Sequence, residues 1–297
     1  MRNLFHWLGR VPGKELAPSQ AKRAEVDHLQ AALILPQRIA SLVSELQQLA
    51  PQQSEHLLSQ VLNGVRVGTP DIERYNAAEA LVAAMYPKFK FSEYGRLFLE
   101  DQAFQDYYRR FMDPGNWHSL DRKYTLDQLL KVVAHLDGDM AECGTYKGAS
   151  AYRMCLALGK SGKIVHLFDS FEGLSAPGEW DGDYWATGAL RTPEASLREA
   201  LADFENYRVY KGWIPERFKD VADGRFSFVH IDVDLYQPTL DSLEFFYPRT
   251  VDGGVIVMDD YGFVTCPGAK RAADEFFSQK LEPVVMLTTG QAFIVKR

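Results

Sequence analysis

Four aspartates in the last third of the chain are the residues whose types and spacing point most directly to chemistry. They follow two apolar stretches, residues 226–231 and 255–258, each with the length and composition of a buried strand. Carboxylates end both stretches: Asp232, Asp234, Asp259 and Asp260. Oxygen-only ligands suit a hard divalent cation such as Mg²⁺, with Mn²⁺ and Ca²⁺ as alternatives.

A helix predicted between these strands makes them neighbours. Residues 240–248 carry apolar side chains at helical spacing, and a Gly-Gly pair precedes the second strand. Strand–helix–strand crossovers pair their strands in parallel, which brings both strand ends to the sheet edge where open α/β sheets bind ligands. A single aspartate after a strand usually caps a helix or turn. For Asp232 together with Asp259 and Asp260, whose unpaired charges would repel, we favour a metal site.

A glycine-bearing turn forms the second candidate binding feature. Residues 139–150 predict a short strand, a turn and a helix start, in which Gly144 allows the turn and Gly148 lets backbone approach a ligand. The next predicted strand ends in Asp169, which either accepts hydrogen bonds from ribose hydroxyls or caps the following turn. The pattern Glu-x-Gly-x-x-x-Gly differs from GxGxxG, so a hydride-transferring enzyme is a weaker alternative.

Length and composition bound the class of protein. The chain has 297 residues, 46% of them hydrophobic, which is enough for an α/β core and an extension. A net charge of −7 without a Lys/Arg run argues against nucleic-acid binding. No apolar stretch approaches membrane-spanning length, and the first ten residues lack the features of a secretory signal. Reduced thiols in a cytoplasmic protein are indicated by three cysteines without CxxC spacing: Cys143, Cys155 and Cys266.

Residues 1–115 are expected to form a helical extension. Apolar residues at helical spacing predict helices over about 21–49, 54–65 and 71–86. The extension would serve as a lid, an oligomer contact or a substrate wall, and the leucine-rich first helix offers a homodimer contact. Residues 90–117 are rich in aromatic side chains, most of which we expect to be core.

Residues 116–297 are expected to form an α/β domain. A helix over about 119–135 is followed by alternating strands and helices, and the last 16 residues predict an antiparallel hairpin. The loop over residues 170–196 is long enough to cover an active site. Seven strands with a final hairpin favour a doubly wound, mostly parallel sheet of the methyltransferase type over a plain dinucleotide fold.

Four stretches together resemble the macrocin O-methyltransferase family, small Mg²⁺- and S-adenosylmethionine-dependent enzymes that methylate sugar hydroxyls on natural products. The resemblance covers about residues 118–277. It rests on AECGTYKGAS, HLFDSFEGL, YKGWIP, and HIDVDLYQPTLDSLEFFYP with GGVIVMDDYGF and GAKRAADEFF. It implies a class I, Rossmann-like methyltransferase fold with seven strands, and an enzyme acting on a small-molecule hydroxyl acceptor.

The resemblance also implies roles for individual residues. Asp232, Asp259 and Asp260 match the metal ligands of the family. Other positions match the residues that surround the methionine part, the ribose and the adenine of the cofactor in the family. These are Ser119, Glu142, Cys143, Gly144, Thr145, Tyr146, Gly148, Ser150, Asp169, Ser170, Gly212, Trp213 and Asp232. Two stretches depart from the family pattern. Residues 230–234 read His-Ile-Asp-Val-Asp where the family usually has Arg-Leu-Asp-Gly-Asp, and residues 237–238 read Gln-Pro in place of Glu-Ser. A sugar acceptor is therefore implied by the family and not by individual residues.

A metal would explain how an alcohol becomes a nucleophile. Chelation by two neighbouring acceptor oxygens lowers the pKa of the reacting hydroxyl and fixes it against the sulfonium methyl group. We expect Asp232 to ligate the metal and accept the proton, with Asp234 or His230 as alternative bases. Two other readings stay open. One is methylation of a catechol-like vicinal diol, with aromatic residues in 89–117 as the wall, and the other is a non-catalytic member of the fold, against which the intact acidic and glycine positions argue.

Overall fold

The structure, a computed structural model, describes residue 59 and residues 68–85, 100–111 and 119–297. Residues 1–101 and 102–297 form two compact units. The first unit contains one described helix of defined bounds, α3 (Asp71–Met85), which agrees with the helix predicted over 71–86. The helix predicted over 21–49, nearly all of the one over 54–65, and the boundary predicted near residue 115 lie outside the described residues.

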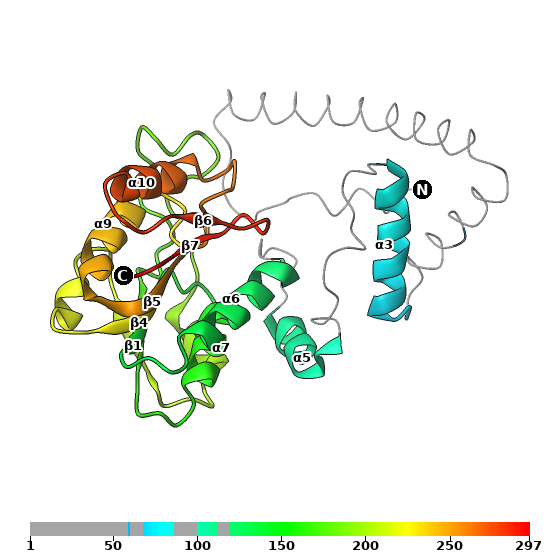
Figure 1. Cartoon of the computed structure of the whole chain (residues 1–297), viewed down its shortest axis with the longest axis horizontal. Helices are drawn as coiled ribbons and strands as arrows, with labels where there is room; N and C mark the ends of the chain where they lie inside the picture. Colours follow the sequence, from blue (N-terminus) through cyan, green and yellow to red (C-terminus); the bar gives the residue numbers. More distant parts are fainter. Residues whose placement is uncertain (1–58, 60–67, 86–99, 112–118) are drawn as a thin grey trace. The chain divides into compact units, whose positions relative to one another are not determined.

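A seven-stranded sheet forms the centre of the second unit (Figure 1). Its order is β3-β2-β1-β4-β5-β7-β6, with parallel pairing from β3 to β5 and antiparallel pairing of β7 with both neighbours. The strands are β1 (Asp139–Cys143), β2 (Val165–Asp169), β3 (Tyr207–Lys211), β4 (Phe226–Ile231), β5 (Thr250–Met258), β6 (Val285–Met286) and β7 (Ala292–Val295). The predicted doubly wound sheet with a final hairpin is confirmed. Strand order reverses between β1 and β4, and ligands bind at such a point in open α/β sheets.

Helices cover both faces of the sheet (Figure 1). Apolar side chains of α6, α7 and α8 pack on one face, and those of α9 and α10 on the other. Successive residues of β5 alternate between the two cores, with Val255 and Val257 on the first face and Ile256 and Met258 on the second. The helices are α5 (Gln102–Phe111), α6 (Leu120–Val132), α7 (Ala149–Leu158), α8 (Glu194–Ala200), α9 (Tyr236–Phe246) and α10 (Pro267–Phe277). Because both faces are covered, β4 and the last four residues of β5 are predominantly apolar in the sequence.

Helix α5 packs within the second unit through its aromatic side chains. The ring of Phe104 meets that of Tyr124 at 5.1 Å, and Tyr107 stacks on Tyr152 at 5.8 Å. The Tyr107 hydroxyl donates a hydrogen bond of 2.9 Å to the carbonyl of Ala149, in the first turn of α7. The aromatic residues Phe104 and Tyr107 of this helix are therefore packing residues, as expected for most of the segment, whose other parts lie largely outside the described residues.

A buried carboxylate anchors the C-terminal hairpin to the rest of the sheet. Glu282, 4% exposed, accepts a hydrogen bond of 2.7 Å from the Tyr247 hydroxyl and one of 3.1 Å from the Arg297 backbone, and it pairs with Lys296 at 3.3 Å. Although burial acts in the opposite direction, these donors together lower the pKa of Glu282 to about 2. The hairpin is thereby held by an ionised group.

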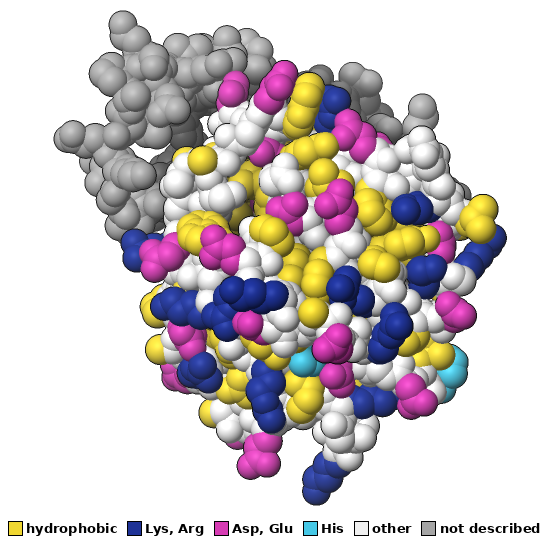
Figure 2. Space-filling model, turned by 90° about the vertical axis from the view of Figure 1, so that its left-hand side faces the viewer, with side chains coloured by type: hydrophobic (Ala, Val, Ile, Leu, Met, Phe, Trp, Pro, Cys, Tyr) yellow, Lys and Arg dark blue, Asp and Glu magenta, His cyan; other side chains and the backbone are white. Residues whose placement is uncertain are grey.

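Two surface properties bear on the class of partner. In the described parts of the chain, no helix combines the length and the apolar character needed to cross a membrane. On the face shown in Figure 2, Lys and Arg side chains are interspersed with Asp and Glu. The described part of that face therefore shows no broad basic surface.

Candidate functional site

The carboxyl ends of β4 and β5 bring acidic side chains together. The two strands are paired in parallel with Ile231 opposite Met258, so the aspartates that follow them share one sheet edge. His230, Asp232 and Asp259 offer ligand atoms that all lie within 4.8 Å of one another. The same holds for a second cluster made of Asp234, Asp260 and Cys266. The three aspartates predicted as metal ligands are thus divided between two neighbouring clusters.

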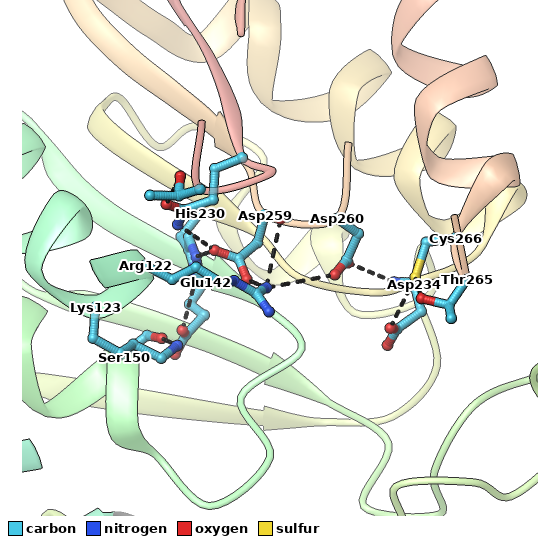
Figure 3. Close-up of polar contacts among 12 residues, drawn as sticks. Arg122, Lys123, Glu142, Ser150, His230, Asp234, Asp259, Asp260, Thr265 and Cys266 are labelled. Atoms are coloured by element: carbon cyan, nitrogen blue, oxygen red, sulfur yellow. Dashed lines mark hydrogen bonds and ion pairs between the residues drawn. The ribbon is translucent and has the colours of Figure 1, made fainter. Parts of the chain in front are cut away.

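Both carboxylate oxygens of Asp259 are contacted by neighbouring side chains at this sheet edge. Its Oδ1 accepts a hydrogen bond of 2.5 Å from Gln291 Nε2 and lies 3.2 Å from His230 Nε2. Its Oδ2 forms an ion pair with the guanidinium of Arg122 and has no hydrogen-bond partner among the described residues. Arg122 Nη2 also lies 3.7 Å from Asp260 Oδ1 (Figure 3). The central guanidinium carbon of Arg122 lies over the Phe263 ring, 4.5 Å from its centre. One buried cation therefore faces two of the predicted metal ligands.

His230 lies buried between two carboxylates. Its Nδ1 is 3.0 Å from Glu142 Oε1, and its Nε2 faces Asp259 (Figure 3). Both ring nitrogens are engaged, and the side chain is fully buried. His230 therefore orients its carboxylate neighbours, and proton transfer to it from a ligand would require breaking one of these contacts.

The second cluster is crowded with like charge. Asp260 Oδ2 accepts a hydrogen bond of 2.9 Å from the Asp234 backbone, and Cys266 Sγ lies 3.5 Å from Asp234 Oδ1. Burial, together with the neighbouring aspartates, raises the pKa of Asp260 well above its ordinary value, while Arg122 acts in the opposite direction. Burial and the charge of Asp232 raise the pKa of Asp234 to about 7. A proton or a bound cation relieves this repulsion.

A cavity of about 850 Å³ opens onto these clusters. Most of the predicted site residues line it: Glu142, Gly144, Thr145, Tyr146, Ser150, Asp169, Ser170, Gly212, Trp213, Asp232, Asp234 and Asp260. Five predicted residues are outside its lining: Ser119, Cys143, Gly148, His230 and Asp259. Ser119 is exposed at the start of α6, where its side chain makes no capping hydrogen bond, and Cys143 is fully buried in the core. The size of the cavity is in the range of small-molecule and cofactor sites.

The two glycines of the β1–α7 turn serve packing more than ligand approach. A Cβ at Gly144 would lie 1.8 Å from the backbone oxygen of Asp232, so this glycine lets the ends of β1 and β4 meet. A Cβ at Gly148 would lie 2.7 Å from Leu197 Cδ1, so the close approach predicted for a ligand is made instead by α8. Both residues have positive φ, 83° and 87°, which glycine tolerates best.

Asp169 caps the same turn. Its Oδ2 accepts hydrogen bonds of 2.8 and 2.9 Å from the backbone of Thr145 and Tyr146, and its Oδ1 accepts one of 2.7 Å from Phe171. The Phe171 contact lies in the turn that follows β2, so the cap considered for that turn is confirmed. Because Asp169 also lines the cavity and Oδ1 keeps a free lone pair, a contact with ribose stays a prediction.

The loop over residues 170–193 contains neither a helix nor a strand and lines the cavity through several residues, including Tyr184 and Trp185. Asp181, 3% exposed, fixes it: its Oδ2 accepts a hydrogen bond of 2.7 Å from Gly178, and its Oδ1 accepts one of 2.6 Å from the backbone of Tyr236 at the start of α9. The loop is thus tied to the sheet edge that carries the aspartates.

Two cations in the site were not predicted from the sequence. Arg122 and Lys123 lie in the first turn of α6, and both are buried against the cavity. Positive charge at a helix N-terminus is unfavourable unless an anion compensates it. Adjacent cations directly after a predicted helix start were therefore a usable signal.

Comparison with known proteins gives one family. The model of the family described as Macrocin-O-methyltransferase (TylF) matches residues 116–287. A Streptomyces olivaceus protein, 8-demethyl-8-(2,3-dimethoxy-alpha-L-rhamnosyl)-tetracenomycin-C 4'-O-methyltransferase, is 32% identical over 152 residues, 44% of this chain and 56% of that protein. The demethyldecarbamoylnovobiocin O-methyltransferase of Streptomyces niveus is 26% identical over 182 residues, 55% and 69% of the two chains. The chain thus spans little more than half the length of the first of these relatives.

Solved structures agree on the architecture. The O-methyltransferase NovP superimposes with a TM-score of 0.51 at 25% identity, covering 62% of this chain and 84% of that one. The calicheamicin methyltransferase CalS11 superimposes with a TM-score of 0.56 at 18% identity, covering 77% and 94%. The second unit therefore has the class I methyltransferase fold.

Proposed function

Since the chain belongs to the macrocin-O-methyltransferase (TylF) family, we propose that it transfers a methyl group from S-adenosylmethionine to a hydroxyl of a sugar, carried by a glycosylated natural product or a polysaccharide precursor. The observation that carries the proposal is the convergence of aspartates from the ends of β4 and β5 on a cavity that the β1–α7 turn also lines. The names of related proteins, one of which specifies a rhamnosyl group, support a sugar acceptor.

The cavity fits S-adenosylmethionine, which would supply the electrophilic methyl group. Glu142 places a buried oxygen without a hydrogen-bond partner, Oε2, where a cationic amino group would satisfy it. Asp169 and Ser170 stand where a ribose would be held, and Gly212 and Trp213 border the part of the cavity proposed for adenine. The remaining lining residues of the turn would exclude water from the reacting centre.

The aspartates fit a divalent cation, which would lower the pKa of a chelated hydroxyl and fix its oxygen. We propose Asp232, Asp259 and Asp260 as its ligands, with Mg²⁺ favoured because every donor is an oxygen. The crowding of aspartates around Asp260 favours a cation here. Arg122 already compensates part of this charge, so it would share the carboxylates with the cation or move aside.

Among the proposed bases, the surroundings favour Asp232. It lines the cavity and is half-buried, so that a substrate hydroxyl can reach its carboxylate. His230 is fully buried with both nitrogens engaged, and Asp234 is buried beside Cys266. We propose that Asp232 accepts the proton and that His230 holds Asp259 in position.

The cavity also offers side chains that suit a sugar acceptor. Tyr184 and Trp185 from the loop over residues 170–193 line it, as does Gln237 at the start of α9. An indole or phenol ring packs against a sugar face, and an amide hydrogen-bonds to hydroxyls.

Two measurements test the proposal. Calorimetry with S-adenosylhomocysteine, which needs no acceptor, should show binding, and absence of binding contradicts the cofactor assignment. A methyl-transfer assay across glycosides and catechols, with Mg²⁺ or with EDTA, should show turnover of glycosides that EDTA removes. Turnover confined to catechols would contradict the sugar acceptor, and full activity in EDTA would contradict the metal.

The remaining predictions concern the cellular setting of the enzyme. All three cysteines are buried and unpaired, which supports the proposed cytoplasmic location. We also propose the helical extension over residues 1–115 as a lid, substrate wall or homodimer contact, and residues 116–297 as the methyltransferase domain.

A further inference from the structure

Lys123 is a buried cation whose role in the site is not explained by the residues around it. The side chain is 3% exposed and lines the cavity beside the start of α7. Its Nζ donates a hydrogen bond of 2.6 Å to Ser150 Oγ, a neutral group (Figure 3). Within the described residues, no carboxylate lies within 4 Å of this ammonium group, which keeps two further donors.

The surroundings of Lys123 are suited to an anion. Ser150 lies in the first turn of α7, whose N–H groups lack partners within the helix and carry partial positive charge. Burial lowers the pKa of Lys123, and the negative charges of Asp232 and Glu142 act in the opposite direction. An ammonium group buried with so little compensation is costly, and a bound anion removes that cost.

Glu142, in the same part of the cavity, is a buried carboxylate with one oxygen that lacks a hydrogen-bond donor among the described residues. It is 1% exposed, its Oε1 faces His230 Nδ1, and its Oε2 is buried without a hydrogen-bond partner in the described part of the chain. Arg122 does not serve it, because that guanidinium pairs with Asp259 and Asp260. One cation and one anion therefore face the same space, each short of a partner.

A group that carries both charges on neighbouring atoms satisfies both residues, and an α-amino acid is such a group. We propose that Lys123, together with Ser150 Oγ and the first-turn N–H groups of α7, binds the carboxylate of the methionine part of the cofactor, while Glu142 Oε2 binds its ammonium group. This inference rests on the proposed function and assigns to Lys123 a contact that the family resemblance did not imply.

The test is a double-mutant cycle in which one change removes the Lys123 ammonium group and the other removes the carboxylate of the ligand. Calorimetry measures the binding of S-adenosylhomocysteine and of its decarboxylated analogue, which keeps the amine, to the wild type and to Lys123→Met. Lys131→Met, on the exposed end of the same helix, is the matched control. A third ligand, 5′-methylthioadenosine, lacks the whole amino-acid part and reports whether the variant keeps a folded adenosine site.

For the wild type we expect S-adenosylhomocysteine to bind about 10- to 100-fold more tightly than the decarboxylated analogue, the size of a hydrogen bond to a charged group. Lys123→Met should lose about the same factor for S-adenosylhomocysteine and little for the other two ligands, whereas Lys131→Met should match the wild type. A merely structural lysine would weaken all three ligands alike.

Two results would overturn the inference. One is a Lys123→Met variant that still distinguishes the two ligands as the wild type does. The other, which decides the question even if that variant does not fold, is a wild type that binds both ligands equally. A wild type that binds none of the three would instead refute the proposed cofactor, and with it this assignment.

Discussion

Replacing Gly144 with alanine tests whether the glycine turn builds the site by letting two strands meet. The new Cβ would lie 1.8 Å from the backbone oxygen of Asp232 and 2.9 Å from its backbone carbon, whereas Cβ atoms keep at least 3.0 Å. The end of β1 or of β4 must therefore move by more than 1 Å. Such a shift strains the hydrogen bond of 2.9 Å from the Asp232 backbone to the Cys143 carbonyl and displaces the Asp232 carboxylate.

Gly162→Ala separates the cost of this contact from the cost of the backbone conformation. Gly162 has φ +79°, close to the +83° of Gly144, and a Cβ there would meet nothing within 4 Å. We expect Gly162→Ala to lower the free energy of unfolding by about 1 kcal/mol, from the positive φ alone. Gly144→Ala should cost roughly 2–4 kcal/mol more, since overpacking and a weakened backbone hydrogen bond add to the same φ term.

Urea unfolding, followed by circular dichroism, measures the stability of both variants. Their metal affinity, measured without urea, reports the displacement of the Asp232 carboxylate. The reasoning predicts a clear loss of stability and of metal affinity in Gly144→Ala only. Equal stability of the two variants would refute it, because the strand ends would then tolerate the added methyl group.

Three further variants test other parts of the account. Asp181→Ala removes the two hydrogen bonds that Asp181 accepts, one of which ties the loop over residues 170–193 to α9. We therefore expect faster proteolysis within this loop and a KM for the acceptor raised about 10-fold. Asp183→Ala, at an exposed position of the same loop, is the control, and equal proteolysis of the two variants would contradict the anchoring role. Glu282→Gln should lower the free energy of unfolding by about 3 kcal/mol at pH 7, from the size of the pKa depression. Because the folded-state pKa is lowered, the difference in stability between the variant and the wild type should narrow as the pH falls from 5 toward 2. Urea unfolding measures this difference, and a difference that does not change with pH would contradict the role of the ionised carboxylate. Asp260→Asn should abolish turnover in the methyl-transfer assay and leave the affinity for S-adenosylhomocysteine, measured by calorimetry, within about 3-fold of the wild type. Retained turnover would count against Asp260 as a metal ligand.

Much of the fold was predictable because its signals are local. The strand β4 and the last four residues of β5 are buried on both faces, so they appear as predominantly apolar stretches. The helix between the two strands fixes their parallel pairing. From that pairing follows the shared sheet edge of Asp232 and Asp259. Helix α6 also begins where Ser119 indicated, although its hydroxyl makes no capping hydrogen bond.

The finer arrangement of the site depends on contacts between distant parts of the chain. Arg122 reaches Asp259 across 137 residues, and no local pattern indicates that this cation would face the predicted metal ligands. Gly148 illustrates the same limit. Its type predicted a close approach, but the partner, Leu197 of α8, is determined by how the helix packs on the sheet. Residue types thus indicated the chemistry, while the tertiary contacts decided which atoms meet.

The most direct test of the central claim, that carboxylates from two adjacent strand ends share one cation, is Mn²⁺ binding followed by electron paramagnetic resonance. Asp232→Asn removes a proposed ligand, and Asp252→Asn, exposed near the opposite end of β5, makes the same change of charge away from the site. We expect the wild type and Asp252→Asn to bind one Mn²⁺ that Mg²⁺ displaces, and Asp232→Asn to bind it at least 10-fold more weakly. Equal Mn²⁺ affinity in all three proteins, or no binding by the wild type, would contradict the account.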